Sequence, residues 1–179
     1  MTQVGINYAQ ALYDLAREEG LTAEILEQLQ TLHESFSAQP DFLRLLCAPN
    51  ISKEERCQVL DQSFRGKVHP YVLNFLKILT EHGYMRHFGD CRKAFEQQYN
   101  LDNGILPVTA VSAVALTDSQ LEKLTGKLCQ ITGKTVKIHN RIDPDCLGGV
   151  RLLYDGKQVD GTVQNRLETI GNLLKNTVL

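Results

Sequence analysis

The sequence has neither a long apolar run nor a charge of one dominant sign. No run approaches the ~20 residues that a membrane-spanning helix needs, so no membrane insertion is expected. The net charge of −2 gives no electrostatic reason to bind nucleic acid or an anionic membrane. Hydrophobic residues at 42% and charged residues at 22% are ordinary for globular proteins. A length of 179 residues then predicts one large domain or two small ones.

The cysteines are widely spaced along the chain. Five cysteines, an odd number with wide gaps, argue against a disulfide framework and predict buried, reduced thiols in a reducing cytoplasm. The first residues, MTQVGINYAQALYDLA, contain no basic segment followed by an apolar stretch. They are not rich in Arg and Ser either, so we expect neither a secretory signal nor a transit peptide.

Patterns that carry chemistry are also missing. The phosphate-binding loop G-x-x-x-x-G-K-[ST] does not occur. Gly148-Gly149 precedes a predicted strand, so this pair lacks the helix N-terminus that would hold an anion. Asp143-Pro144-Asp145 and Asp155-Gly156 are turn sequences, in which Asp is favoured for its local hydrogen bonds. The sequence therefore predicts no catalytic residue and no cofactor.

One set of side chains has partial metal-ligand character. His87 and Cys91 are four residues apart on a predicted helix, and they could share a zinc ion with Cys57 or His82. Structural zinc needs four ligands, and the sequence contains no C-x-x-C or H-x-x-x-H pair. Packed thiols and a solvated histidine are the simpler interpretation, and no metal is expected.

Residues 1–104 show helical periodicity throughout. Prolines at two predicted helix starts, glycines at helix ends and a capping box formed by Ser52 with Glu55 set the boundaries. The six helices are expected before Gly20 and at residues 21–36, 40–48, 52–64, 70–81 and 84–99. Asn103-Gly104 ends the helical region.

Residues 105–179 have a mixed pattern. Strands are expected at 105–116 and 135–142, separated by a helix at 118–131 that begins with a second capping box, Thr117 with Gln120. Asp155-Gly156 predicts a hairpin between strands 150–154 and 157–160. A last helix is expected from about residue 162, with an apolar face formed by Val163, Leu167, Ile170 and Leu174. The predicted fold is mainly α: an N-terminal six-helix bundle (1–104) followed by a small α/β C-terminal domain (105–179).

Two helices carry more apolar surface than a bundle requires. The first has the stripe Ile6, Ala9, Tyr13 and Ala16 and a second stripe beside it, while the fifth is apolar on most sides. Either both helices are central in the bundle, or they form a hydrophobic groove for an amphipathic partner helix. The residues expected to line such a groove are Tyr8, Ala11, Leu12, Leu15, Val72, Phe75, Leu76 and Leu79.

Four segments resemble, in the same order, those of one known family. They are YAQALYDLA, LLCAPNISKEER, FLKILTEHGYM and KIHNRIDPDCLGGVRLLYDGKQVDGTVQNRLETI. The last is the most specific, with its Ile-Asp, Gly-Gly-Val, Asp160-Gly161 and Arg166-Leu167. Over nearly its whole length the sequence is similar to the delta subunit of bacterial F-type ATP synthase, the family of the oligomycin-sensitivity-conferring protein.

The resemblance implies a structural role rather than an enzymatic one. It implies that residues 1–104 hold the N-terminal helix of an alpha subunit between the first and fifth helices. It also implies that residues 105–179 contact the b subunits, so that the protein belongs to the peripheral stalk, or stator, at the cytoplasmic face of a bacterial membrane. The alternative from the residues alone is an unrelated helical adaptor or regulatory domain that binds an amphipathic partner helix.

Overall fold

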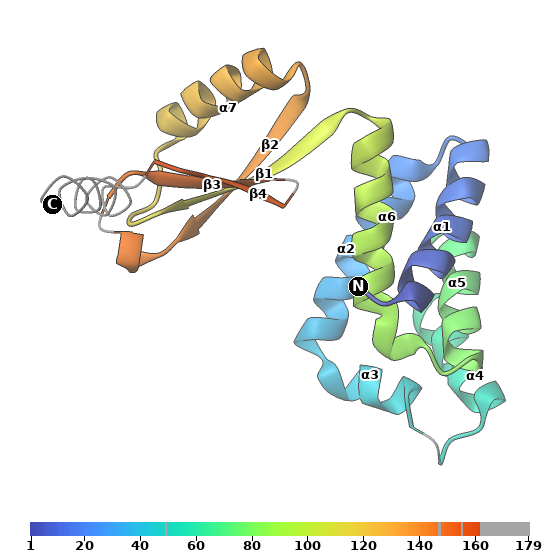
Figure 1. The fold of residues 1–179 in the computed structure, drawn as a ribbon. Helices are drawn as coiled ribbons and strands as arrows, with labels where there is room; N and C mark the ends of the chain where they lie inside the picture. The colour runs from blue at the N-terminus through green and yellow to red at the C-terminus, as the bar shows by residue number, and fades with distance from the viewer. Residues whose placement is uncertain (49, 147, 155, 162–179) are drawn as a thin grey trace, which may run out of the picture. The chain divides into compact units, whose positions relative to one another are not determined.

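The chain folds as two units, a helical one followed by an α/β one (Figure 1). The structure is a computed structural model and describes residues 1–48, 50–146, 148–154 and 156–161. The two units are Met1–Tyr99 and Asn100–Leu179, and each has a hydrophobic core. The predicted fold class is confirmed, because helices form the first part and a mixed sheet with a helix forms the second.

Within the described residues, six α-helices form the helical part of the chain, and the last of them continues past Tyr99 into the second unit. They are α1 (Gln3–Glu18), α2 (Thr22–Ala38), α3 (Pro40–Leu46), α4 (Lys53–Phe64), α5 (Pro70–Glu81) and α6 (Phe88–Asp102). The predicted sixth helix differs at its start, because Met85–His87 form a separate 3₁₀ turn, η1. The capping box of α4 is present: Ser52 Oγ accepts from the Glu55 backbone N–H at 3.2 Å, and the Glu55 carboxylate accepts from the Ser52 N–H at 3.1 Å.

The core of the first unit contains a pair of buried aromatic rings. Tyr13 of α1 and Phe95 of α6 are both fully buried and meet edge to face, with 5.1 Å between ring centroids. Ala9 and Ala16, on the same face of α1 as Tyr13, are buried too, and their small side chains let neighbouring helices pack closely. Ile6 departs from the predicted core stripe, because 39% of it is exposed.

A buried arginine holds the connection between α3 and α4. Arg56 is only 8% exposed, and its Nη1 donates to the carbonyl oxygen of Leu46 at 3.0 Å. This carbonyl belongs to the last turn of α3, where helix carbonyls lack an intrahelical partner. The arginine of the segment LLCAPNISKEER therefore has a structural role.

The second unit is built around a four-stranded sheet of described residues in the order β2-β1-β3-β4. Its elements are β1 (Ile105–Ser112), α7 (Asp118–Thr132), β2 (Thr135–Ile142), the 3₁₀ turn η2 (Pro144–Cys146), β3 (Val150–Tyr154) and β4 (Lys157–Asp160). Strands β1 and β2 are parallel and joined through α7, whereas β3 is antiparallel to β1 and β4 to β3. The helix predicted from about residue 162 lies outside the described residues.

Strand β1 ends at Ser112, earlier than the predicted residue 116, because side-chain hydrogen bonds turn the chain there. Ser112 Oγ donates to the Val114 carbonyl at 2.7 Å. Asn140 of β2 donates to the Ala110 carbonyl and to Ser112 Oγ, both at 2.9 Å. The Asn140 amide oxygen also accepts from the Leu116 N–H at 2.9 Å. The side-chain amide of Asn140 thus binds the end of β1 and also the backbone just before α7.

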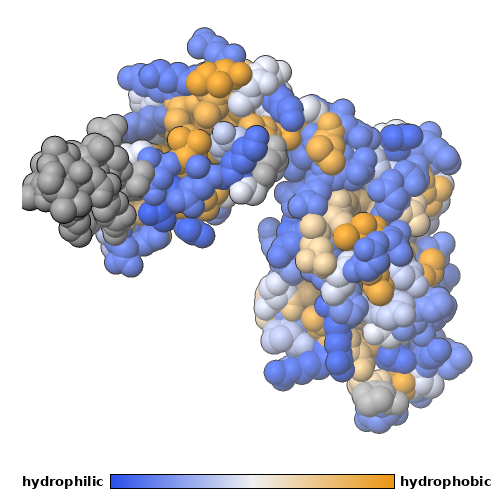
Figure 2. Space-filling model, in the orientation of Figure 1, coloured by the Kyte–Doolittle hydropathy of each residue, from blue (hydrophilic) through white to orange (hydrophobic). Residues whose placement is uncertain are grey.

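The core of the second unit lies between α7 and one face of the sheet. Leu106, Val108 and Val136 are buried there, with Leu128 and Cys129 of α7 packed against them. Figure 2 shows hydrophobic side chains between α7 and the strands. Ile142, at the end of β2, is 56% exposed and does not belong to this core.

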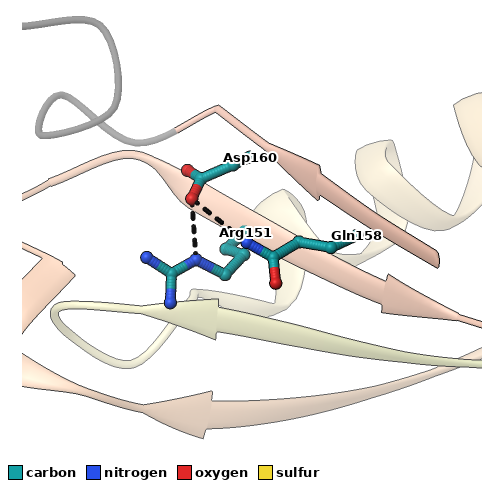
Figure 3. A network of polar contacts seen from close by, with 3 residues as sticks. All are labelled: Arg151, Gln158 and Asp160. Atoms are coloured by element: carbon teal, nitrogen blue, oxygen red, sulfur yellow. Dashed lines mark hydrogen bonds and ion pairs between the residues drawn. The ribbon is translucent and has the colours of Figure 1, made fainter. Parts of the chain in front are cut away.

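A cross-strand ion pair joins β3 and β4 (Figure 3). Arg151 Nε donates to Asp160 Oδ2 at 2.9 Å, and this hydrogen bond and the charge of Asp160 raise the pKa of Arg151. The N–H of Gly161 donates to the Val150 carbonyl at 3.1 Å, and a Cβ at this position would lie 3.1 Å from the same oxygen. Both residues of the Asp160-Gly161 pair therefore secure the hairpin.

The buried arginine gives a stability prediction. Arg56→Met keeps much of the apolar volume but leaves the Leu46 carbonyl without its donor, so the free energy of unfolding should fall by about 1–3 kcal/mol. Arg65→Met, at the exposed end of α4, is the matched control and should change it by less than about 0.5 kcal/mol. Urea denaturation measures both, and equal stabilities for the two variants would contradict the assigned role.

Candidate functional site

A groove of about 380 Å³ lies on the surface of the first unit, between α1 and α5. The two helices run in opposite directions (Figure 1), and the Tyr8 ring near the start of α1 lies 6.3 Å from the ring of His82, just after α5. The groove is lined by Tyr8, Ala11, Leu12, Leu15, Tyr71, Asn74, Phe75 and Ile78. Asn74 is the one residue among these eight that has no apolar or aromatic side chain.

The wall formed by α1 consists of the four residues that the sequence pattern indicates. Ala11 and Leu15 are exposed, the latter by 37%, while Tyr8 is half-buried and Leu12 is 5% exposed. Their outward position follows from helix geometry. Each residue turns the helix by about 100°, so Ala11 and Leu15, two positions from the core residue Tyr13, point away from it.

The wall formed by α5 corrects the predicted set. Phe75 lines the groove, whereas Val72, Leu76 and Leu79 have no exposed surface and belong to the core. Tyr71, Asn74 and Ile78 line the groove in their place. The helix is apolar around most of its circumference, so its hydrophobic pattern does not indicate which side faces outward.

The sequence contains a pattern that identifies the groove residues of α5 that were not predicted. The α1 wall reads Y-x-x-A-L-x-x-L over residues 8–15, and the α5 wall reads Y-x-x-N-F-x-x-I over residues 71–78. Both have the spacing i, i+3, i+4, i+7 that places side chains on one helix face. Aligning the two helices on this pattern selects Tyr71, Asn74 and Ile78.

An aromatic cluster surrounds Tyr8, one of the residues that line the groove. The ring of Tyr8 meets that of Tyr84 edge to face, with centroids 5.7 Å apart. His82 stacks on Tyr84 at 6.3 Å. These contacts position the Tyr8 ring on the groove wall.

Hydrogen bonds fix the first turn of α1 to α6. The Thr2 backbone N–H and hydroxyl each donate to Asp90 Oδ2 at 2.9 Å, and the Gly5 N–H donates to Thr2 Oγ1 at 3.3 Å. The bonds from the Thr2 N–H and then from its hydroxyl lower the pKa of Asp90. Gly5 is buried here, and a Cβ added to it would lie 2.8 Å from Asp90 Cβ. Only glycine allows α1 to approach α6 this closely.

The residues considered as zinc ligands do not gather into a site. In the described part of the chain, no three His, Cys, Asp or Glu side chains are placed to hold a metal ion. Burial raises the pKa of Cys91 to about 11, with a smaller contribution from Asp90. The Cys91 thiol therefore stays protonated at neutral pH, and a thiol is a poor ligand compared with a thiolate.

A larger hollow of about 510 Å³ lies at α2, α3 and the end of α4. The rings of Phe36, Phe42 and Phe64 lie in its wall and pack against one another at 5.9–6.1 Å. The remaining wall residues, including Ser35 and Gln39, are polar or small. The α1/α5 groove, with an apolar side chain at nearly every position, is the better receptor for an apolar helix face.

The chain thus combines a helical unit that carries an apolar groove with a small α/β unit. The sequence model of the ATP synthase delta (OSCP) subunit matches residues 4–174, and the chain belongs to this family. Members of this family are non-catalytic stator subunits of F-type ATP synthase. This membership sets aside the alternative of an unrelated adaptor.

Comparisons with individual proteins give the same family assignment. The chain is 32% identical to ATP synthase subunit delta of Erythrobacter litoralis over 170 residues, covering 94% of this chain and 92% of the relative. It is 29% identical to that of Clostridioides difficile over 172 residues, covering 96% and 95%. A chain of the Toxoplasma gondii mitochondrial ATP synthase hexamer has the same fold, with a TM-score of 0.77, 18% identity and coverage of 97% and 98%. Among the described residues, no helix has the length and apolar character to cross a membrane.

The close approach at Gly5 gives a second stability prediction. Alanine usually stabilises a helix interior by up to about 1 kcal/mol relative to glycine. In Gly5→Ala the contact with Asp90 should reverse this gain, because overpacking costs about 1–3 kcal/mol. Gly126→Ala in α7, where a Cβ meets nothing within 4 Å, should show the usual gain. Urea denaturation followed by circular dichroism measures both variants, and a stabilised Gly5→Ala would contradict the packing described.

Proposed function

We propose that the α1/α5 groove holds the N-terminal helix of an ATP synthase alpha subunit. The observation that carries this proposal is an apolar groove with two helical walls at the surface of a delta-family chain. An amphipathic helix placed in such a groove buries its apolar face against i, i+3, i+4, i+7 positions of both walls. Burial contributes about 25 cal/mol per Å² of apolar surface, so one helix provides a strong anchor.

We further propose that residues 105–179 bind the b subunits of the peripheral stalk, at the cytoplasmic face of a bacterial membrane. Family membership and the bacterial relatives support this assignment. The second unit also has apolar side chains available for contact, since Val114, Ile131 and Val159 are 72%, 81% and 50% exposed. The chain would then link the catalytic head to the stalk and keep the head from turning with the central shaft.

A single substitution tests the groove. Ala11→Leu adds a bulky side chain to an exposed groove position, where leucine is nearly as good a helix former as alanine. We expect the affinity for a peptide of the alpha-subunit N-terminus to fall by about tenfold or more through overpacking, with an unchanged melting temperature. Gln10→Leu makes a similar change at the neighbouring exposed position outside the groove, and should leave the affinity unchanged.

Two results would count against the proposal. Unchanged peptide affinity in Ala11→Leu would show that the helix binds elsewhere. A lowered melting temperature with unchanged affinity would show that Ala11 packs in the core. Titration calorimetry and thermal denaturation of the two variants separate these outcomes.

The separation of the two binding regions gives another prediction. If the alpha and b subunits bind different units, saturating the full-length chain with the alpha peptide should leave its affinity for the C-terminal segment of a b subunit within about twofold. Ala11→Leu should also leave the b-subunit affinity unchanged. Mutual exclusion of the two ligands in a competition titration would contradict the assignment of residues 105–179.

A further inference from the structure

The two walls of the groove are related by an approximate twofold symmetry. Because α1 and α5 are antiparallel and share one spacing, Tyr8 corresponds to Tyr71 at the opposite end, and Leu15 corresponds to Ile78. Leu12 and Phe75, 5% and 6% exposed, form equivalent parts of the floor. A helix docked in such a groove meets nearly the same apolar pattern in either direction. Apolar contacts alone therefore give little preference for one direction.

One pair of equivalent positions breaks this symmetry. Ala11 on α1 corresponds to Asn74 on α5, and both are exposed near the middle of the groove. Alanine has no hydrogen-bonding side chain, whereas asparagine offers one acceptor and two donors. Among the described residues, the side-chain amide of Asn74 has no hydrogen-bond partner, so in the free protein it is hydrated by solvent.

A docked helix would cover the Asn74 amide and remove this water. A polar group that is buried without a partner costs free energy, and a partner removes the penalty. In coiled coils one buried asparagine fixes the register of the helices for the same reason. Turning the docked helix end for end would move its matching polar group from Asn74 to Ala11, where no partner exists.

We propose that Asn74 determines the direction and register of the docked helix by hydrogen bonding to one polar side chain on that helix's otherwise apolar face. This inference rests on the proposed function of the groove. It adds that the docked helix carries one polar side chain on its apolar face. It also adds that this side chain binds to the α5 wall and not to the α1 wall.

Binding measurements provide the first test. The probe is a synthetic peptide of the alpha-subunit N-terminal segment, titrated into the full-length chain. Asn74→Leu gives a more apolar groove but removes the hydrogen bond, and we expect binding to weaken about five- to fiftyfold. Equal or tighter binding would overturn the inference. Replacing the matching polar residue of the peptide by leucine should cost little further affinity in this variant, since the two changes remove one interaction.

The second test measures direction. A spin label at one end of the peptide should broaden the NMR signals of the wild-type groove near Tyr8 or near Tyr71, but not both. The exchange variant Ala11→Asn with Asn74→Ala moves the amide to the equivalent position on the other wall, at two exposed sites that leave the core intact. We expect the broadened end to switch in this variant. The same end in both proteins would overturn the inference.

A control separates this inference from the proposed function. Ile78→Glu places a charge in the groove at a position that is 42% exposed, and it should abolish peptide binding if the groove is the site. If Ile78→Glu binds normally, the proposed function and the inference both fail. If Ile78→Glu abolishes binding while the Asn74 variants keep the wild-type affinity and direction, the proposed function stands and the inference fails.

Discussion

The packing of Tyr13 against Phe95 determines how α1 presents its other side chains. Because Tyr13 is fully buried, with its ring 5.1 Å from that of Phe95, the rotation of α1 about its own axis is fixed. Ala11 and Leu15, two residues away on either side, must then face outward. The hydrogen bonds of Thr2 to Asp90 fix the same helix at its first turn. One face of α1 therefore packs in the core and another lines the groove. A substitution that changes the core packing would also move the groove residues of α1.

The sequence predicts the two walls of the groove unequally, and the reason is physical. On α1 the sequence shows two apolar stripes but not which of them faces outward, and the structure places the stripe of Ala11 and Leu15 at the groove. On α5, apolar residues occur on nearly every side, and nothing indicates that Val72, Leu76 and Leu79 face inward. Helix ends with capping residues were predicted to within a few residues. The end of β1 was not, because it depends on Asn140, which lies 28 residues along the chain from Ser112.

Several residues in the segments that identify the family hold the backbone in place. Arg56 binds the last turn of α3, Asn140 closes the sheet, and the Arg151–Asp160 pair joins β3 and β4. Arg56 and Asn140 satisfy backbone groups that neighbouring secondary structure leaves open, and Arg151 and Asp160 pair their charges across two strands. These are requirements of folding rather than of reactivity.

Only Asn103 and Gly104 stand between the end of α6 and the start of β1. The Gly104 N–H bonds to the Leu101 carbonyl at 3.2 Å, and its carbonyl accepts from the Thr135 N–H at 3.1 Å. Two residues span at most about 7 Å when extended, so this tether contains almost no slack. A pull along the chain from α6 to β1 is therefore transmitted before much extension occurs. Mechanically, the covalent link from α6 to β1 therefore has low compliance to stretching along the chain.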